Sequence, residues 1–105
     1  MRRAAKVDAN HVEIVAALRA IGATVQSLAA VGGGCPDLLV GYRGANHVFE
    51  VKSPLGAHGG DSRDGQKLQP SQVAWLGAWR GHVELVRTAD EAIDLVSGRR
   101  LPCAT

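Results

Sequence analysis

Residues 32–52, GGGCPDLLVGYRGANHVFEVK, constrain the fold of this chain more than any other stretch. Two short runs within it, residues 38–40 and 47–51, are rich in branched and aromatic side chains, and a loop that contains Gly44 separates them. Two such runs around a glycine-containing loop are typical of a β-hairpin. We therefore expect a pair of antiparallel strands here, with the turn centred on Gly44 and Ala45.

The predicted hairpin gathers charged side chains on one face. Because side chains alternate along a strand, Val48, Glu50 and Lys52 share a face. With this turn, Asp37 would lie opposite Lys52 and diagonal to Glu50, and diagonal neighbours are roughly 7–8 Å apart. Two carboxylates and an ammonium group in this arrangement suit a divalent cation that activates water against a phosphodiester. A register shift of one residue would move Asp37 to the other face and remove the site.

Length and composition predict one small domain over residues 1–105. No apolar run is long enough to span a membrane, and the basic start of the chain is not followed by an apolar signal core. We therefore expect a cytoplasmic protein without a membrane partner, in a bacterial cell or in its host if phage-encoded. The cysteines at 35 and 103 predict reduced thiols. The four aromatic residues are too few for base stacking along a single strand.

The rest of the chain predicts helices and strands around the hairpin. The expected elements are a helix over residues 8–22, a strand over 24–30, the hairpin, a helix over 70–80, a strand over 82–87 and a helix that starts with a capping box at 88–91 and stops at 98. Since a crossover helix precedes the last strand, that strand should run parallel to its neighbour. The order predicts an α/β fold, with a mixed sheet flanked by helices.

Helical spacing also predicts the buried sides of these helices. The candidates are Ile14, Leu18 and Ile21 in the first helix, Val73, Leu76 and Trp79 or Trp75 in the second, and Ala92, Ile93, Leu95 and Val96 in the last. Outside the elements we expect a basic arm over 1–7, a mobile loop over 53–67 and a tail over 98–105. The loop is either a lid or substrate-contacting segment beside the site, or a disordered segment without a role.

Three further features adjoin the predicted site, and two of them allow two interpretations. Glu13, one position before the apolar Ile14, is either a solvated helix residue or a third acid near the metal. Gln72, in the first turn of the second helix, is either solvated or turned toward the strand that carries Lys52. The glycines at 32–34 allow backbone conformations that other residues avoid and the close approach of a ligand.

These residues together resemble a known class of enzymes. The motif GCPD at residues 34–37, followed after twelve residues by EVK at 50–52, resembles the PD-(D/E)xK nuclease superfamily, whose core is α-β-β-β-α-β. With LQPSQVAWL at 68–76, the chain is similar more narrowly to the VRR-NUC (virus-type replication-repair nuclease) family, over roughly residues 8–96. Small stand-alone members of that family occur in phages and bacteria, and some are dimeric Holliday-junction resolvases.

The resemblance implies a role for each matched residue. It implies metal ligands at Glu13 (directly or through water), Asp37, Glu50 and the carbonyl of Val51. Lys52 would position the attacking water or stabilise the phosphorane charge, as an electrostatic aid and not a general base. Gln72 matches the polar residue on the helix after the site. The metal would be Mg²⁺, with Mn²⁺ as a substitute, because Mg²⁺ needs few carboxylates and keeps several waters.

The expected function is therefore that of a metal-dependent DNA endonuclease in repair, recombination or phage replication. By resemblance it would act on branched or Holliday-junction DNA as a homodimer, so that two sites cut two strands. Two alternatives remain open at this point. One is a nuclease for nicks, ends, flaps or duplex DNA, and the other is a DNA-binding module of the same fold that does not cut.

Overall fold

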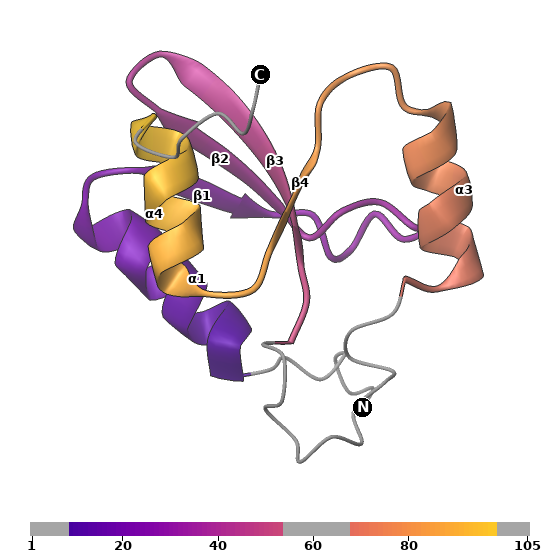
Figure 1. Cartoon of the computed structure of the whole chain (residues 1–105), viewed down its shortest axis with the longest axis horizontal. Coiled ribbons are helices and arrows are strands. Elements are labelled where there is room, and N and C mark those ends of the chain that lie inside the picture. The colour runs from indigo at the N-terminus through magenta and orange to yellow at the C-terminus, as the bar shows by residue number, and fades with distance from the viewer. Residues whose placement is uncertain (1–8, 54–67, 99–105) are drawn as a thin grey trace, which may run out of the picture.

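The computed structural model describes residues 9–53 and 68–98, so the predicted basic arm and nearly all of the predicted loop and tail lie outside the described residues. Within that part, four strands form one sheet in the order β1-β2-β3-β4. The strands are β1 (Thr24–Ser27), β2 (Leu38–Tyr42), β3 (Ala45–Val51) and β4 (Glu84–Val86), and the helices are α1 (Ala9–Ala20), α3 (Pro70–Ala78) and α4 (Ala89–Ser97) (Figure 1). Strands β1 to β3 pair antiparallel, and β4 is parallel to β3. The predicted α/β class, mixed sheet and parallel last strand are confirmed.

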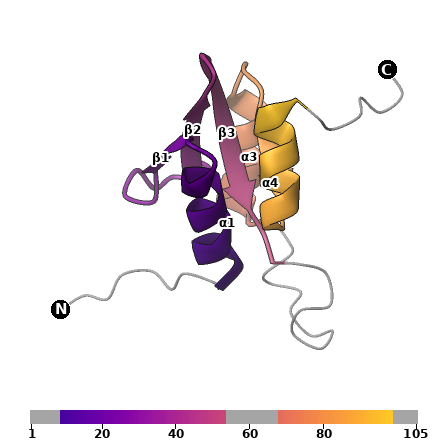
Figure 2. The same cartoon turned by 90° about the vertical axis from the view of Figure 1, so that its left-hand side faces the viewer.

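Helices α1 and α4 pack side by side against one face of the sheet, and α3 lies on the other side (Figures 1 and 2). Alternation along the strands sends one set of apolar side chains to the α1 and α4 face. The core there consists of Ile14, Leu18, Ala23, Leu38, Val40, Phe49, Val86, Ala92 and Val96. The predicted core positions of α1 and α4 therefore agree with the structure, except that Ile21, Ile93 and Leu95 are only partly buried.

The centre of the hairpin turn lies one residue earlier in the sequence than predicted. Tyr42 pairs with Ala45, so the two-residue turn is Arg43–Gly44. Both turn residues have positive φ angles, 50° and 84°, and a two-residue turn with two positive φ angles matches the twist of antiparallel strands. Leu38 consequently pairs with Phe49, and the same register continued by one residue sets Asp37 opposite Glu50, not opposite Lys52.

Several elements are shorter than predicted. Strand β1 ends at Ser27, because its Oγ accepts a hydrogen bond from the N–H of Ala29 (3.2 Å) and the chain turns there. Strand β4 covers Glu84–Val86 of the predicted 82–87. Helix α3 ends at Ala78, because Trp79 is already in an extended conformation.

Helix α4 has the predicted caps. The Thr88 Oγ accepts a hydrogen bond from the N–H of Glu91 (3.1 Å), which satisfies one donor of the first turn. The Glu91 carboxylate accepts from the N–H of Arg87 (2.7 Å), one residue before the expected capping partner. Gly98 ends the helix in the left-handed conformation, with φ 74°.

The predicted burial of one side of α3 is wrong. None of its residues is buried, and Val73 and Trp79 are 54% and 49% exposed. Trp75 and Leu76 are half-buried. The helical pattern did not show whether another element covers these residues. No helix among the described residues combines the length and the apolar composition needed to cross a bilayer.

Candidate active site

The charged side chains of β3 lie on the sheet face that α1 and α4 leave uncovered. Phe49 points into the core, so Glu50 points to the other face, and Lys52 follows on the same side. Both side chains are nevertheless buried, with exposed fractions of 3% and 7%. The Lys52 Nζ lies 3.7 Å from the Glu50 Oε2. Glu50 and Lys52 therefore share one face of the sheet, as predicted.

Gln72 bridges these two charges from α3. Its Nε2 donates to the Glu50 Oε2 (2.6 Å), and its Oε1 accepts from the Lys52 Nζ (3.1 Å). The same Oε1 accepts from the backbone N–H of Gln69 (2.9 Å) at the start of α3. Of the two interpretations left open by the sequence, the one that turns Gln72 toward Lys52 is therefore the one that the structure adopts.

The glycine loop holds the first turn of α3 against the site. A Cβ at Gly34 would lie 2.1 Å from the carbonyl oxygen of Ser71, and Gly34 has a φ of 88°. Only glycine tolerates both this contact and this conformation. The glycines predicted the close approach of a ligand. At Gly34 the group that approaches is the backbone of α3 at Ser71, one residue before Gln72.

Asp37 is anchored across the two strands. Its backbone N–H donates to the carbonyl of Phe49 (3.0 Å), and its carboxylate Oδ2 accepts from the N–H of Val51 (2.7 Å). Pro36, which fixes the chain just before Asp37, is fully buried. The main chain of Val51 therefore adjoins the Asp37 carboxylate, while the ligand role of its carbonyl stays a prediction.

The electrostatics of the site centre on Glu50. Burial raises its pKa to about 7, the negative charge of Asp37 adds to the rise, and Lys52 and Gln72 oppose it. A carboxyl group with such a pKa is only half ionised near neutral pH. A divalent cation held by Glu50 and Asp37 would lower this cost, because its positive charge would favour the ionised form of both carboxyl groups.

The donor set suits magnesium. Within residues 9–53 and 68–98, no three His, Cys, Asp or Glu side chains are grouped as they would be around a metal ion. Asp37 and Glu50 form the acidic pair of the site, and Mg²⁺ in proteins is commonly held by one or two carboxylates while it keeps several waters. Two hard oxygen donors on one sheet face therefore fit Mg²⁺ better than a metal that requires a closed protein shell.

Cys35 lies close enough to the carboxylates of the site for their charge to change the pKa of its thiol. Burial raises the pKa of its thiol, and the carboxylates of Asp37 and Glu50 raise it further. The thiol is free and half-buried. Because the thiolate is the reactive form of cysteine, a raised pKa makes Cys35 a poor nucleophile at neutral pH.

The structure does not bring Glu13 to the acidic pair. Glu13 is exposed on α1, which covers the opposite face of the sheet. Its role as a metal ligand therefore stays a prediction without support from the described geometry.

Asn10 of α1, for which the sequence predicted no role, makes hydrogen bonds at the end of the site strand. Its Nδ2 donates to the carbonyls of Lys52 (2.8 Å) and Arg87 (3.2 Å), so it joins the end of β3 to the end of β4. A signal was present, because Asn10 lies four residues before Ile14 and eight before Leu18, on the buried stripe of the helix. A polar residue on such a stripe needs buried partners.

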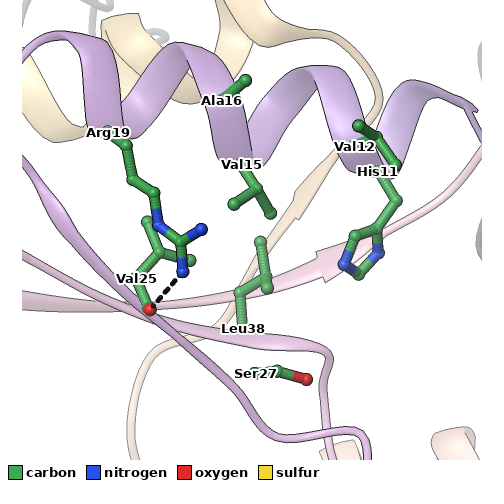
Figure 3. A pocket seen from close by; sticks show the side chains of 8 residues that line it. All are labelled: His11, Val12, Val15, Ala16, Arg19, Val25, Ser27 and Leu38. Carbon is green, nitrogen blue, oxygen red and sulfur yellow. Dashed lines mark hydrogen bonds between the residues drawn. The ribbon is translucent and has the colours of Figure 1, made fainter.

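A separate hollow of about 350 Å³ lies between α1 and the first two strands (Figure 3). Arg19 reaches from α1 to donate a hydrogen bond to the carbonyl of Val25 (3.2 Å) at the edge strand β1. The lining residues are His11, Val12, Val15, Ala16, Arg19, Val25, Ser27 and Leu38, none of which is acidic. This hollow is therefore not the place for a metal held by carboxylates.

Fold and site together define a small α/β domain with a buried acid–amide–lysine cluster beside a second carboxylate. Comparison of the chain with protein-family models, with curated proteins and with solved structures returned no match.

Proposed function

We propose that this chain is a metal-dependent nuclease of the PD-(D/E)xK type, similar to the VRR-NUC family, that hydrolyses phosphodiester bonds in DNA. The observation that carries the proposal is the bridge from Gln72 to both Glu50 and Lys52, on the sheet face that also holds Asp37. The three residues that the motif assigns to catalysis and the glutamine of the following helix are thus neighbours. An incidental surface pair would not be buried and bridged in this way.

The acidic pair would hold Mg²⁺, or Mn²⁺ in its place. The ligands would be Asp37, Glu50 and, by resemblance, the Val51 carbonyl. When bound, the cation supplies charge neutralisation of the phosphodiester and an activated water. The hydrogen bond from the Val51 N–H holds the Asp37 Oδ2 in place, which orients the carboxylate before any substrate arrives.

Lys52 supplies positive charge to the reacting phosphate in this proposal. Its ammonium group is held near Glu50 and by the Gln72 amide oxygen, so little reorganisation is needed when negative charge develops. The amide of Gln72 cannot take up or release a proton at neutral pH. Gln72 therefore acts as a positioning residue, which fixes the Glu50 carboxylate and the Lys52 ammonium relative to each other.

The finer part of the proposal is the substrate. We infer branched or Holliday-junction DNA and a homodimer, since a chain with one such site needs a second copy to cut two strands. The support is the resemblance of residues 34–37, 50–52 and 68–76 to a family with such members. The pathway would then be repair, recombination or phage replication.

Cleavage of a labelled four-way junction and of its matched linear duplex, with Mg²⁺ or Mn²⁺, tests the proposal. The protein would be wild type or Asp37→Asn, which keeps an acceptor for the Val51 N–H. Paired symmetric nicks near the junction, absent with the variant and on the duplex, are the expected result. Cutting of both substrates would leave a nuclease for duplex, nicked or flapped DNA, and junction binding without cutting would leave a DNA-binding module.

A further inference from the structure

Trp75 of α3 and Trp79, the residue that caps the end of this helix, continue the side of the helix on which Gln72 enters the site. With 3.6 residues per turn, positions three, four and seven residues after Gln72 lie on its side of the helix. These positions are Trp75, Leu76 and Trp79. The side of the helix that carries Gln72 therefore continues, away from the acidic pair, as a row of apolar side chains.

The two indole rings are stacked on each other. Their centroids are 4.5 Å apart and their planes differ by 18°. Trp79, at the outer end of the row, is 49% exposed, while Trp75 is half-buried. Gly81 lies against the Nε1 edge of Trp79, since a Cβ there would be 2.8 Å from that atom. The pair is thus an ordered stack with one large aromatic ring still open to solvent.

We propose that Trp75 and Trp79 form a platform on which one unpaired nucleobase of the DNA substrate stacks, close to the scissile phosphate. This inference rests on the proposed nuclease function and adds that one nucleotide at the branch point is unpaired when the DNA is bound. Seven residues of helix span about 10 Å, which equals roughly three nucleotide steps along a strand. A base within about three nucleotides of the cut would therefore reach the platform.

An unpaired base fits this surface better than a paired one. A base inside a duplex is stacked on both sides, so it has no free face for an indole, whereas an unpaired base gains by stacking on an aromatic side chain. Arg80 follows Trp79 and is exposed, so the platform has a cationic neighbour that a nucleotide phosphate could contact. One pair of rings holds one base, in keeping with the few aromatic residues of the chain.

Tryptophan fluorescence gives a direct test, because Trp75 and Trp79 are the two tryptophans of the whole chain. The wild-type protein would be titrated, in Ca²⁺ in place of Mg²⁺, with oligothymidylate, with the same oligomer carrying abasic sugars, and with a blunt duplex. We expect strong quenching by oligothymidylate and little by the other two. Equal quenching by the abasic oligomer would overturn the platform, since only phosphates would then be recognised.

Variants of α3 provide the matched controls. Trp79→Leu should weaken the affinity for labelled oligothymidylate about tenfold, and Trp79→Phe should restore most of it. Val73→Ala should leave the affinity unchanged, because Val73 is exposed on another side of the same helix. Equal losses in Trp79→Leu and Val73→Ala would overturn the proposal.

The same experiment separates the platform from the nuclease function. Base-dependent quenching without cutting in Mg²⁺ would support the platform and count against catalysis. Cutting with no fluorescence change would support the nuclease and overturn the platform, and absence of any DNA binding would overturn both. A fluorescence shift that depends on protein concentration without DNA would identify the α3 face as an interface between copies of this chain and overturn the platform.

Discussion

The carboxylate of Asp37 accepts a hydrogen bond from the backbone N–H of Val51 at 2.7 Å, so one of the two site acids is also part of the pairing between β2 and β3. Its backbone N–H extends the same pairing to Phe49. A substitution at this position therefore has a structural effect that can be separated from its effect on catalysis.

Asp37→Ala should destabilise the protein by about 1–3 kcal/mol, because the Val51 N–H loses its partner in a partly buried place. Asp37→Asn keeps an acceptor and should stay within about 1 kcal/mol of wild type. Neither variant should cut DNA. Urea unfolding of the three proteins measures the difference, and an Asp37→Asn variant as unstable as Asp37→Ala would contradict this explanation.

Glu50→Gln should stabilise the metal-free protein above neutral pH. The pKa of Glu50 is raised from 4.5 to about 7 on folding, so the folded state binds more protons than the unfolded state between these values. Stability of the wild type therefore falls as pH rises through this window, by about 3 kcal/mol in total. Unfolding at pH 5 and pH 8 in EDTA should show similar stabilities at pH 5 and an advantage of Glu50→Gln at pH 8. An equal difference at both pH values would count against a raised pKa.

Mg²⁺ should raise the unfolding temperature of wild type but not that of Glu50→Gln. Because the ligand form of Glu50 is deprotonated, the apparent affinity for Mg²⁺ should increase up to about tenfold per pH unit below the pKa of about 7 and level off above it. Thermal unfolding over a series of Mg²⁺ concentrations at pH 6 and pH 8 measures this. A shift of the same size in Glu50→Gln would place the ion elsewhere.

Gly34→Ala should displace the start of α3, because the added Cβ would lie 2.1 Å from the Ser71 carbonyl oxygen. Gly33→Ala is the matched control, since Gly33 also has a positive φ, 66°, but nothing lies within 4 Å of its Cβ position. The control should cost about 1–2 kcal/mol for its backbone conformation alone. Gly34→Ala should cost more and should also change the tryptophan fluorescence and abolish cleavage. Indistinguishable variants would mean that the loop does not support α3.

Asn10→Ala should destabilise the protein by about 1–3 kcal/mol, because the buried carbonyl of Lys52 and the partly buried carbonyl of Arg87 lose a donor. Glu13→Ala, on the same helix but exposed, should change stability by less than about 0.5 kcal/mol. If Glu13 binds metal as the resemblance implies, its variant will instead weaken the stabilisation by Mg²⁺. Chemical unfolding with and without Mg²⁺ separates the two roles.

The hairpin and the proximity of Glu50, Lys52 and Gln72 were predictable because their signals are local. The turn lies one residue earlier than predicted, and this changes the strand pairing by two residues. Asp37 therefore lies opposite Glu50, whereas the predicted partner was Lys52. Because strand faces alternate with a period of two, an even shift keeps every side chain on its face. The prediction that Asp37, Glu50 and Lys52 share a face therefore survived an incorrect register.

The surroundings of α3 were not predictable, because they depend on contacts between segments that are distant in the sequence. Helical periodicity shows which residues share a side, and it placed Gln72 correctly at the start of the helix. It contains no information on which element covers that side, so Val73 and Trp79 were expected in a core that does not extend to them. Asn10 was not predicted because helical periodicity is carried by apolar residues, and one polar residue on the stripe adds nothing to that signal.

The side chain of Gln72 accepts from the Gln69 N–H at the start of α3 while it binds Glu50 and Lys52. The first helical turn and the charged cluster are therefore coupled through one side chain. Among the described residues, the core lies in the sheet, α1, α4 and the Ala23 that follows α1, with no contribution from α3, so we expect α3 to open before the rest of the domain unfolds. Such a partial opening requires less free energy than global unfolding. The proposed activity of this site would then depend on the local stability of one nine-residue helix, and any ligand that holds α3 in place would raise the fraction of molecules with an assembled site.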